Sequence, residues 1–321
     1  MSVEQKKDHV SFYHFSFFKS PYFMLSLVII IWGINYVVGR LLSHSFPSIP
    51  GLEQQHMSGT FYGFYRYFFR TLTMFFVIIY QKKTFTGVIE EINPIKYYLI
   101  LSAFFSAIFV LASHASSEYI SSGTTSIIVN LCPVLVFLYG LIFLREKLTL
   151  LKLMGFFLGV IGGSLFLFSS FNSSSGSSSI GVFLAIIGMV SWGTYSILLY
   201  YMGGNDSYII MTVKHGISTL ISIPIIFYVS IENNNEMVLV IDLWTIFGFI
   251  FGGIFATGIA YILYFKAIES LGAPKASAFL FLIPFVSLLG DTLLGELPPI
   301  ISLFGGIIAL IGVFFIKISK K

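Results

Sequence analysis

Apolar and polar residues alternate along this chain in long blocks. Ten apolar segments, most of them about 20 residues long, are separated by short polar stretches. A bilayer core about 30 Å thick needs about 20 apolar residues per helix. The pattern therefore predicts an all-α membrane protein with ten transmembrane helices, at residues 22–42, 59–80, 96–116, 121–144, 150–170, 180–202, 208–230, 243–265, 274–294 and 299–317.

One pair of apolar segments is used twice. The stretch 119–168 contains two such segments joined by a short charged turn, and the stretch 271–316 repeats that arrangement. Similar spacing at two places indicates an internal repeat. Four positions recur 150 residues later and one proline recurs 151 residues later, so that Gly140, Glu146, Gly155, Gly162 and Pro133 correspond to Gly290, Glu296, Gly305, Gly312 and Pro284.

Composition excludes several other classes. Charged residues make up 10% of the chain and hydrophobic residues 56%, whereas soluble domains carry roughly 25% charged residues. The net charge of +4 comes from basic residues scattered between apolar segments, so it does not indicate nucleic-acid binding. The single cysteine, Cys132, excludes an intramolecular disulfide, and no metal or thiol-redox set of residues is visible. We expect no cofactor, and a lipid bilayer and a small molecule as partners.

The positions of Lys and Arg predict the orientation. If the N-terminus is cytoplasmic, every Lys and Arg in a loop or at a helix end faces the cytoplasm except Arg40, as the positive-inside rule requires. The first apolar segment is too long for the core of a cleaved signal peptide and lacks a small-residue cleavage site. We therefore expect a multi-pass protein of the cytoplasmic membrane with cytoplasmic tails at 1–21 and 318–321.

Five spans per half place the second half in the opposite orientation. The halves, residues 22–171 and 180–317, would then be inverted repeats related by an axis in the membrane plane, which is a common transporter architecture. Residues 172–179 are rich in Ser and Gly and are expected to be a linker. The longest external loop, residues 42–59, is either an external lid or an inert connection.

Two tryptophan-glycine pairs lie near the middle of the first and sixth spans. Trp32 and Trp192 are too deep for the membrane interface, where tryptophan is usually found. One interpretation is that both face a central cavity together with Asn35, Tyr36 and Tyr195. The other is helix packing, in which glycine permits a close approach and tryptophan fills the gap.

Basic residues occur inside two spans. Arg66 and Arg70 lie in the second span, and Lys214 lies with His215 in the seventh. Because ionisable residues are costly in a bilayer, they are candidates for function. Arg70 and Lys214 are predicted to contact a substrate carboxylate or phosphate, while for Arg66 a packing role is an equal alternative. Carboxylates inside spans are scarce, so proton coupling through a histidine stays open.

Two prolines lie inside predicted spans. Pro133 and Pro284 each lack an N–H donor and are expected to kink the fourth and ninth spans. Such kinks are tolerated in membranes where neighbours or cavity water satisfy the freed carbonyl. We interpret both prolines as hinges.

The order of these motifs resembles the EamA-type transporters of the drug/metabolite transporter superfamily. The resemblance rests on the two Trp-Gly pairs, on Arg66-Tyr67 at the second span, on Ser-Gly-Thr-Thr-Ser before Pro133, and on the Leu-Arg-Glu-Lys-Leu-Thr and Leu-Gly-Glu-Leu turns. It implies an exporter or exchanger of small metabolites, often amino acids, that works by alternating access. It also implies a cavity lined by spans 1, 3, 4, 6, 8 and 9, which adds Tyr261 and Tyr264 to the candidates.

Together with the resemblance, these observations predict a carrier and not an enzyme. Its substrate is expected to be a small polar metabolite, such as an amino acid or related organic acid, and export is the expected direction of transport. A sugar-nucleotide or sugar-phosphate exchanger and a hydrophobic drug efflux protein are the transport alternatives. An intramembrane lipid-modifying enzyme would need catalytic carboxylates, histidines or cysteines gathered at one membrane depth, and the sequence shows no such group.

Overall fold

The computed structural model describes residues 20–43, 48–54, 56–80, 84–119, 122–143, 149–173, 179–232, 239–293 and 300–319. The predicted turns around Glu146 and Glu296, most of the N-terminal tail and most of the Ser/Gly linker lie outside these residues. The elements in chain order are α2 (Pro21–Ser43), α3 (Gly59–Tyr80), α4 (Phe85–Ile92), η1 (Asn93–Ile95), α5 (Lys96–Tyr119), α6 (Ser122–Val129), α7 (Cys132–Phe143), α8 (Leu150–Ser173), α9 (Ser179–Tyr201), α10 (Ser207–Glu232), α11 (Leu243–Ile250), η2 (Phe251–Ile259), α12 (Ala260–Leu271), α13 (Ala273–Ala278), η3 (Phe279–Leu282), α14 (Ile283–Leu293) and α15 (Ile300–Ile318).

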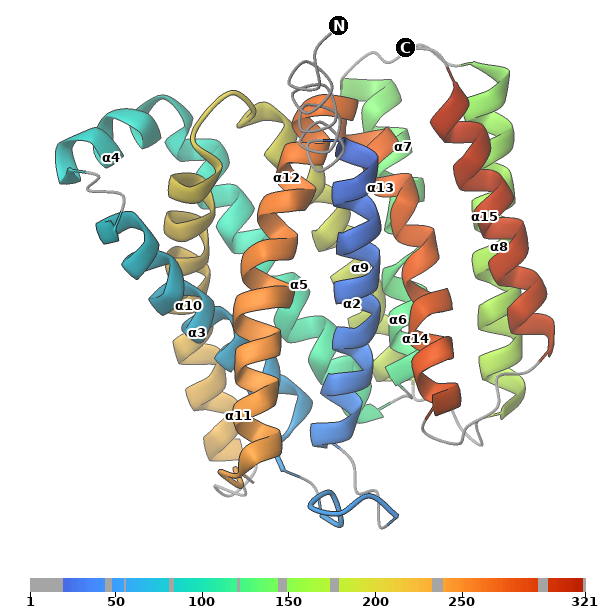
Figure 1. Ribbon diagram of the computed structural model, residues 1–321, viewed down its shortest axis with the longest axis horizontal. Coiled ribbons are helices and arrows are strands. Elements are labelled where there is room, and N and C mark those ends of the chain that lie inside the picture. The colour runs from blue at the N-terminus through green and yellow to red at the C-terminus, as the bar shows by residue number, and fades with distance from the viewer. Residues whose placement is uncertain are drawn as a thin grey trace, which may run out of the picture.

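The helices form one bundle in which most of them run between two ends. Helix α2 begins and α15 ends at the upper end in Figure 1, while α2 finishes at the lower end, where the loop before α3 begins. Within the described part of the chain the structure is helical, apart from one isolated antiparallel bridge between Met57 and Leu239 at the lower end. The prediction of an all-α protein is confirmed.

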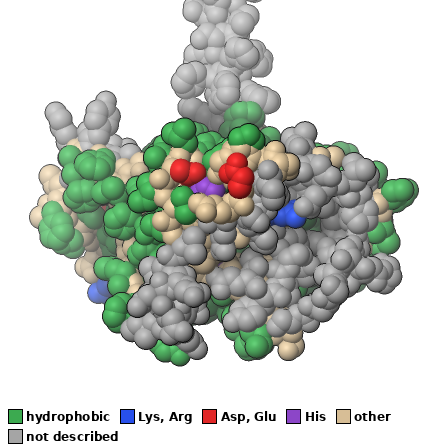
Figure 2. Space-filling model, turned by 90° about the horizontal axis from the view of Figure 1, so that it is seen from below, with side chains coloured by type: hydrophobic (Ala, Val, Ile, Leu, Met, Phe, Trp, Pro, Cys, Tyr) green, Lys and Arg blue, Asp and Glu red, His purple; other side chains and the backbone are tan. Residues whose placement is uncertain are grey.

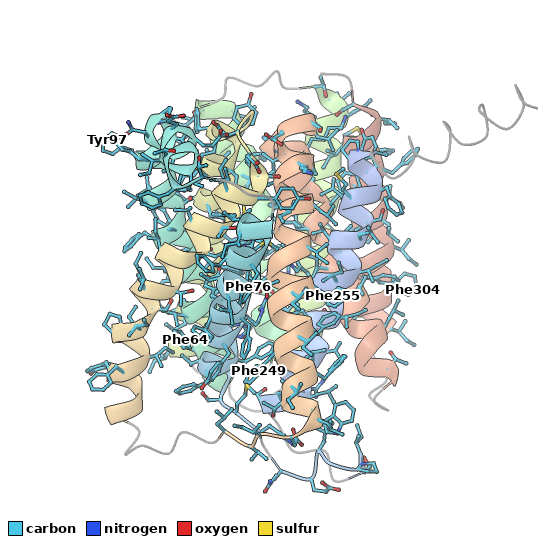
Figure 3. All side chains as sticks on the ribbon, turned by 60° about the vertical axis from the view of Figure 1, so that its left-hand side comes forward. Phe64, Phe76, Tyr97, Phe249, Phe255 and Phe304 are labelled. Atoms are coloured by element: carbon cyan, nitrogen blue, oxygen red, sulfur yellow. The ribbon has the colours of Figure 1, made fainter. Side chains whose placement is uncertain are left out.

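Large apolar side chains cover the outside of the bundle. Phe76 and Phe304 are more than half exposed, and Tyr97 and Phe304 point away from the helices (Figure 3). Five of the described helices are long and apolar enough to cross a membrane, and four shorter apolar helices accompany them. An apolar exterior around buried charged side chains is what a bilayer requires. The chain is therefore a multi-pass membrane protein.

Two predicted spans are interrupted close to their prolines. A turn at 130–131 separates α6 from α7, and the 3₁₀ segment η3 separates α13 from α14. Pro133 is the second residue of α7 and Pro284 the second residue of α14. Both prolines therefore lie in the first turn of a helix that follows an irregular segment, a position that proline tolerates well. The sequence pattern placed them inside unbroken helices, whereas the structure places them where a helix begins again, and their role as hinges stays a prediction.

The eighth predicted span is also irregular. Its residues form α11, then the π-helical segment η2, then α12. In this segment Thr257 Oγ1 donates a hydrogen bond of 2.6 Å to the Gly252 carbonyl, five residues earlier. A π-helical segment widens the backbone and is frequent at functional sites. The sequence pattern did not indicate it.

Glycines that recur in the sequence contact one another across α8 and α15. A Cβ atom added to Gly155 would lie 2.6 Å from the Gly312 carbonyl oxygen, and one added to Gly162 would lie 2.5 Å from that of Gly305. A Cβ atom added to Gly312 would likewise lie 2.6 Å from the Gly155 carbonyl oxygen, so this contact requires glycine on both helices. Residue numbers rise along α8 as they fall along α15, so the two helices pack antiparallel.

The two Trp-Gly pairs also make corresponding contacts. A Cβ atom added to Gly33 would lie 2.5 Å from the Val286 side chain, and one added to Gly193 would lie 3.2 Å from Leu135. The first contact joins α2 to α14, and the second joins α9 to α7. Val286 follows Leu135 by 151 positions, the same spacing that separates Pro284 from Pro133. One helix contact therefore occurs twice in the bundle.

Candidate functional site

A cavity of about 70 Å³ lies inside the bundle between α2, α3, α5 and α6. It reaches from Trp32, near the middle of α2, to Ser43 at the lower end of that helix and to Gly59 at the start of α3. One buried water needs roughly 10–15 Å³, so the space exceeds that of a single water several-fold. Five of the predicted site residues line it, namely Trp32, Asn35, Tyr36, Trp192 and Tyr261.

Aromatic rings close the cavity toward the upper end. The ring of Trp32 lies edge-on to Trp192 at 5.1 Å and to Tyr261 at 5.3 Å between centroids. Tyr264 stacks on Trp192 at 5.7 Å and lies edge-on to Trp32 at 5.3 Å, and Tyr195 contacts Trp192 at 5.1 Å. Neither Tyr195 nor Tyr264 is part of the cavity lining; they support the rings that are.

The Trp32 side chain is held by the π-helical segment. Its indole Nε1 donates a hydrogen bond of 2.7 Å to the Ala256 carbonyl of η2. A buried indole N–H needs such a partner. This bond orients the ring across the upper end of the cavity. The two interpretations of the Trp-Gly pairs both hold for the first pair, because Trp32 lines the cavity while Gly33 permits the approach of α14.

Arg66 is the cavity residue that sequence reasoning left undecided. Its Nε donates to Thr257 Oγ1 at 3.2 Å, its Nη1 lies 3.4 Å from His114 Nε2, and its guanidinium carbon is 5.6 Å from the centre of the Tyr62 ring. Tyr62 in turn donates to Asn35 Oδ1 at 2.8 Å. The side chain is thus oriented toward the cavity by neutral partners on α3, α5 and η2.

The charge of the lining is one-sided. Arg40 and Arg66 contribute to it, and no Asp or Glu is found among the described residues that line the space. An arginine in an aromatic, low-dielectric cavity without a nearby carboxylate attracts an anion. Asn35 and Asn130 add amide groups that accept or donate hydrogen bonds.

Arg70 and Lys214 do not reach the cavity. Arg70 is fully buried between α3 and α10, where its Nη1 donates to the Met211 carbonyl at 3.1 Å and contacts His215 Nδ1. Lys214 Nζ donates to Ser106 Oγ at 3.0 Å and to the Tyr195 hydroxyl at 3.3 Å. We call Arg70, Lys214 and His215 the inner cationic cluster.

The loop before α3 is fastened at the lower end. His56 Nε2 lies 2.8 Å from Asp242 Oδ2, and His56 Nδ1 lies 2.9 Å from the Gln54 carbonyl oxygen. Asp242 also caps α11 by accepting the Thr245 N–H at 2.9 Å. Seen from below, acidic side chains and a histidine lie together on this face, and a single basic side chain lies to the right of them (Figure 2).

The Asp242 carboxyl has a lowered pKa. Burial by itself raises this pKa, but the hydrogen bonds from the Thr245 N–H and from His56 outweigh it. These contacts join residues 48–57 to the start of α11, close to where the cavity approaches the lower end. No group of three metal-ligating side chains occurs in the described part of the chain.

Comparison with known proteins agrees with this architecture. A model of the EamA-like transporter family matches residues 19–168 and again 179–318. A protein named "Uncharacterized transporter" from Archaeoglobus fulgidus is 30% identical over 62% of this chain and 68% of its own length. "Uncharacterized transporter YoaV" from Bacillus subtilis is 24% identical over 89% of this chain and 93% of its own.

One solved crystal structure shares the fold, with a TM-score of 0.71 over 93% of this chain and 97% of that one, at 13% identity. The family match covers both halves of the chain and confirms the resemblance drawn from the Trp-Gly pairs and the Glu-containing turns. The chain therefore belongs to the EamA-like transporter family of the drug/metabolite transporter superfamily.

Proposed function

We propose that this transporter carries a small organic acid or amino acid across the cytoplasmic membrane by alternating access. The cavity is its outward-facing binding site, and transport runs in the direction of export. The observation that carries the proposal is the position of Arg66, which lines the cavity with aromatic rings and amides around it and no carboxylate among the described lining residues. Such a site favours a carboxylate attached to a small body.

Each part of the cavity has a role in this proposal. The Arg66 guanidinium binds the carboxylate through charge-assisted hydrogen bonds. Asn35 and Asn130 hydrogen-bond to an amino or hydroxyl group of the substrate. The rings of Trp32, Trp192 and Tyr261 pack on its apolar part, and their mutual contacts separate it from the upper end.

The proposed topology consists of ten spans in two inverted repeats of five. The antiparallel packing of α8 on α15 through recurring glycines supports this arrangement, as does the repeated contact at Gly33 and Gly193. A two-fold axis in the membrane plane is a common basis of alternating access. In this orientation the lower end of Figure 1 is external, both termini are cytoplasmic, and the helix restarts at Pro133 and Pro284 serve as hinges.

Counterflow in proteoliposomes tests the proposal. Vesicles are loaded with pooled amino acids, organic acids, sugar phosphates or cationic amphiphilic dyes, and exchange of a labelled member of each pool is followed. We expect exchange of one carboxylate pool, strongly reduced at low substrate concentration in Arg66→Gln and retained in Lys96→Gln, which alters an exposed basic residue at the upper end. Exchange of sugar phosphates alone, of dyes alone, or of nothing by folded protein would overturn the proposal.

A further inference from the structure

We infer that the inner cationic cluster is a second carboxylate site, to which the substrate passes from Arg66 when the protein opens toward the other side of the membrane. The inference rests on the proposed function for the passage of the substrate. The site itself rests on the charges, the free hydrogen-bond donors and the position of Arg70, Lys214 and His215.

The cluster brings together basic side chains without an acidic partner. Arg70, Lys214 and His215 are all completely buried, and among the described side chains no Asp or Glu is buried. An unpaired charge inside a membrane protein costs several kcal/mol. Tyrosine rings offset part of this cost, since Lys214 Nζ lies 4.3 Å from the centre of the Tyr195 ring and 4.7 Å from that of Tyr261. The remaining charge is what a bound anion would neutralise.

The free donors of Arg70 have the arrangement that a carboxylate needs. Arg70 Nη1 donates to the Met211 carbonyl oxygen, whereas Nε and Nη2 are buried without a hydrogen-bond partner. These two N–H groups lie on one edge of the guanidinium and form the fork that binds both oxygens of a carboxylate. His215 Nε2 is also buried and unpartnered. Buried donors of this kind are rarely left unpaired in native proteins.

Only one layer of side chains separates the cluster from the cavity. Tyr261 lines the cavity, and its ring also lies 4.9 Å from the His215 ring. Arg66 and Arg70 are four residues apart, so they project from neighbouring turns of α3. A carboxylate released by Arg66 would meet Arg70 one helical turn further, about 5.4 Å along the axis.

The π-helical segment lies against both arginines. A Cβ atom added to Gly252 would lie 2.7 Å from Arg66 Cγ, and one added to Gly258 would lie 3.8 Å from Arg70 Cδ. Tyr261 follows this segment directly in α12. A change in the hydrogen bonding of η2 would therefore move the ring that separates the two sites and rearrange the surroundings of both arginines together.

The binding test uses the full chain in nanodiscs, with arginine side chains labelled with ¹⁵N and sodium acetate as the probe. Arg70→Lys identifies the Arg70 Nε–H resonance by its disappearance. We expect acetate, but neither acetamide nor sodium chloride, to shift this resonance downfield in a saturable manner. The shift should persist in Arg66→Gln. In Lys214→Gln the apparent affinity for acetate, obtained from the titration, should be about tenfold lower. An Arg70 resonance that acetate leaves unchanged in folded protein overturns the second site.

Counterflow separates this inference from the proposed function. Arg70→Gln should keep the folded state, seen as unchanged elution in gel filtration, but lose at least about tenfold in exchange rate. If wild type exchanges no carboxylate while acetate still shifts Arg70, the transport proposal fails and the anion site stands. If wild type exchanges a carboxylate and Arg70→Gln does so equally fast, the passage through the cluster is wrong and the proposed function stands.

Discussion

Two arginines one turn apart on α3 have different environments. Arg66 is 7% exposed, lines the cavity, and is oriented by Thr257 and His114. Arg70 is 0% exposed, is bound through one nitrogen, and keeps its Nε and Nη2 without a partner. The difference teaches that the depth of a basic residue in the bundle does not by itself determine whether the residue lines the cavity. The neighbouring elements η2 and α10 decide it.

The cavity and the inner cationic cluster differ in the same way as the two arginines, because the first is open and the second is enclosed. The cavity combines one guanidinium with amides and aromatic faces, and it has space. The inner cationic cluster combines three basic side chains with tyrosine rings, and it is completely buried. The first arrangement fits initial binding and the second fits a state that forms only when Tyr261 moves. Variants that affect one site and spare the other test this distinction.

Removing the charge of the cavity should have the largest effect. Arg66→Gln removes a charge-assisted pair with the carboxylate, worth about 1.5–3 kcal/mol, and should raise the KM for carboxylate exchange by roughly tenfold to a hundredfold. Arg66→Lys should recover part of this loss because it restores the charge without the fork. Counterflow at varied substrate concentration measures both. An unchanged KM in Arg66→Gln would contradict the cavity as the binding site.

Removing one of the tryptophans that close the cavity toward the upper end should have the next largest effect. Trp32→Ala or Trp192→Ala removes rings that contact each other at 5.1 Å and separate the cavity from the upper end. We expect exchange to fall about tenfold, with a smaller loss of protein in the membrane. Trp244→Phe, at the lower end and outside the cavity lining, is a matched control. If the alanine variants are simply absent from the membrane, packing alone explains these tryptophans.

Disturbing the bundle away from both sites should alter stability and leave substrate preference unchanged. Gly155→Val places side-chain atoms against the Gly312 carbonyl and should destabilise the protein by about 1–3 kcal/mol. Gly216→Ala is the control for stability alone, because its added Cβ would meet Thr71 at an ordinary 3.6 Å; it is not compared for transport, since it is next to His215 of the inner cationic cluster. Thermal unfolding in detergent measures the loss. A variant that unfolds like wild type would contradict the close α8–α15 contact.

The smallest effect is expected at the lower end, from the contact between His56 and Asp242. Because the pKa of Asp242 is lowered in the folded protein, its contribution to stability is present above the usual carboxyl pKa of about 4 and is lost as the pH falls through the lowered value. Unfolding temperatures between neutral and acidic pH measure this. Asp242→Asn should lower the unfolding temperature at neutral pH and bring the two proteins closer together in acid. A difference that grows in acid would contradict the assignment.

Sequence reasoning succeeded where the signal is local. The Trp-Gly pairs, the Ser-Gly-Thr-Thr-Ser motif and the Glu-containing turns identified the family, and five predicted cavity residues were found together in the lining. It failed at the irregular backbone of η2 and at the helix restarts, because the apolar pattern runs through them without interruption. Tyr62, His114 and Asn130 were missed as lining residues because each looks like ordinary packing in its own segment.

The sequence by itself determined that this is a helical membrane protein of the EamA-like family. A backbone that crosses a bilayer must form an apolar helix of about 20 residues. Whether a segment can do so depends on its own length and composition, which the sequence gives directly. Only the tertiary structure decided that Arg66 lines the cavity while Arg70 is enclosed. Their immediate neighbours are similar in type, and the distinction comes from η2, α5 and α10, which lie far away in the sequence and meet α3 only when the bundle is assembled.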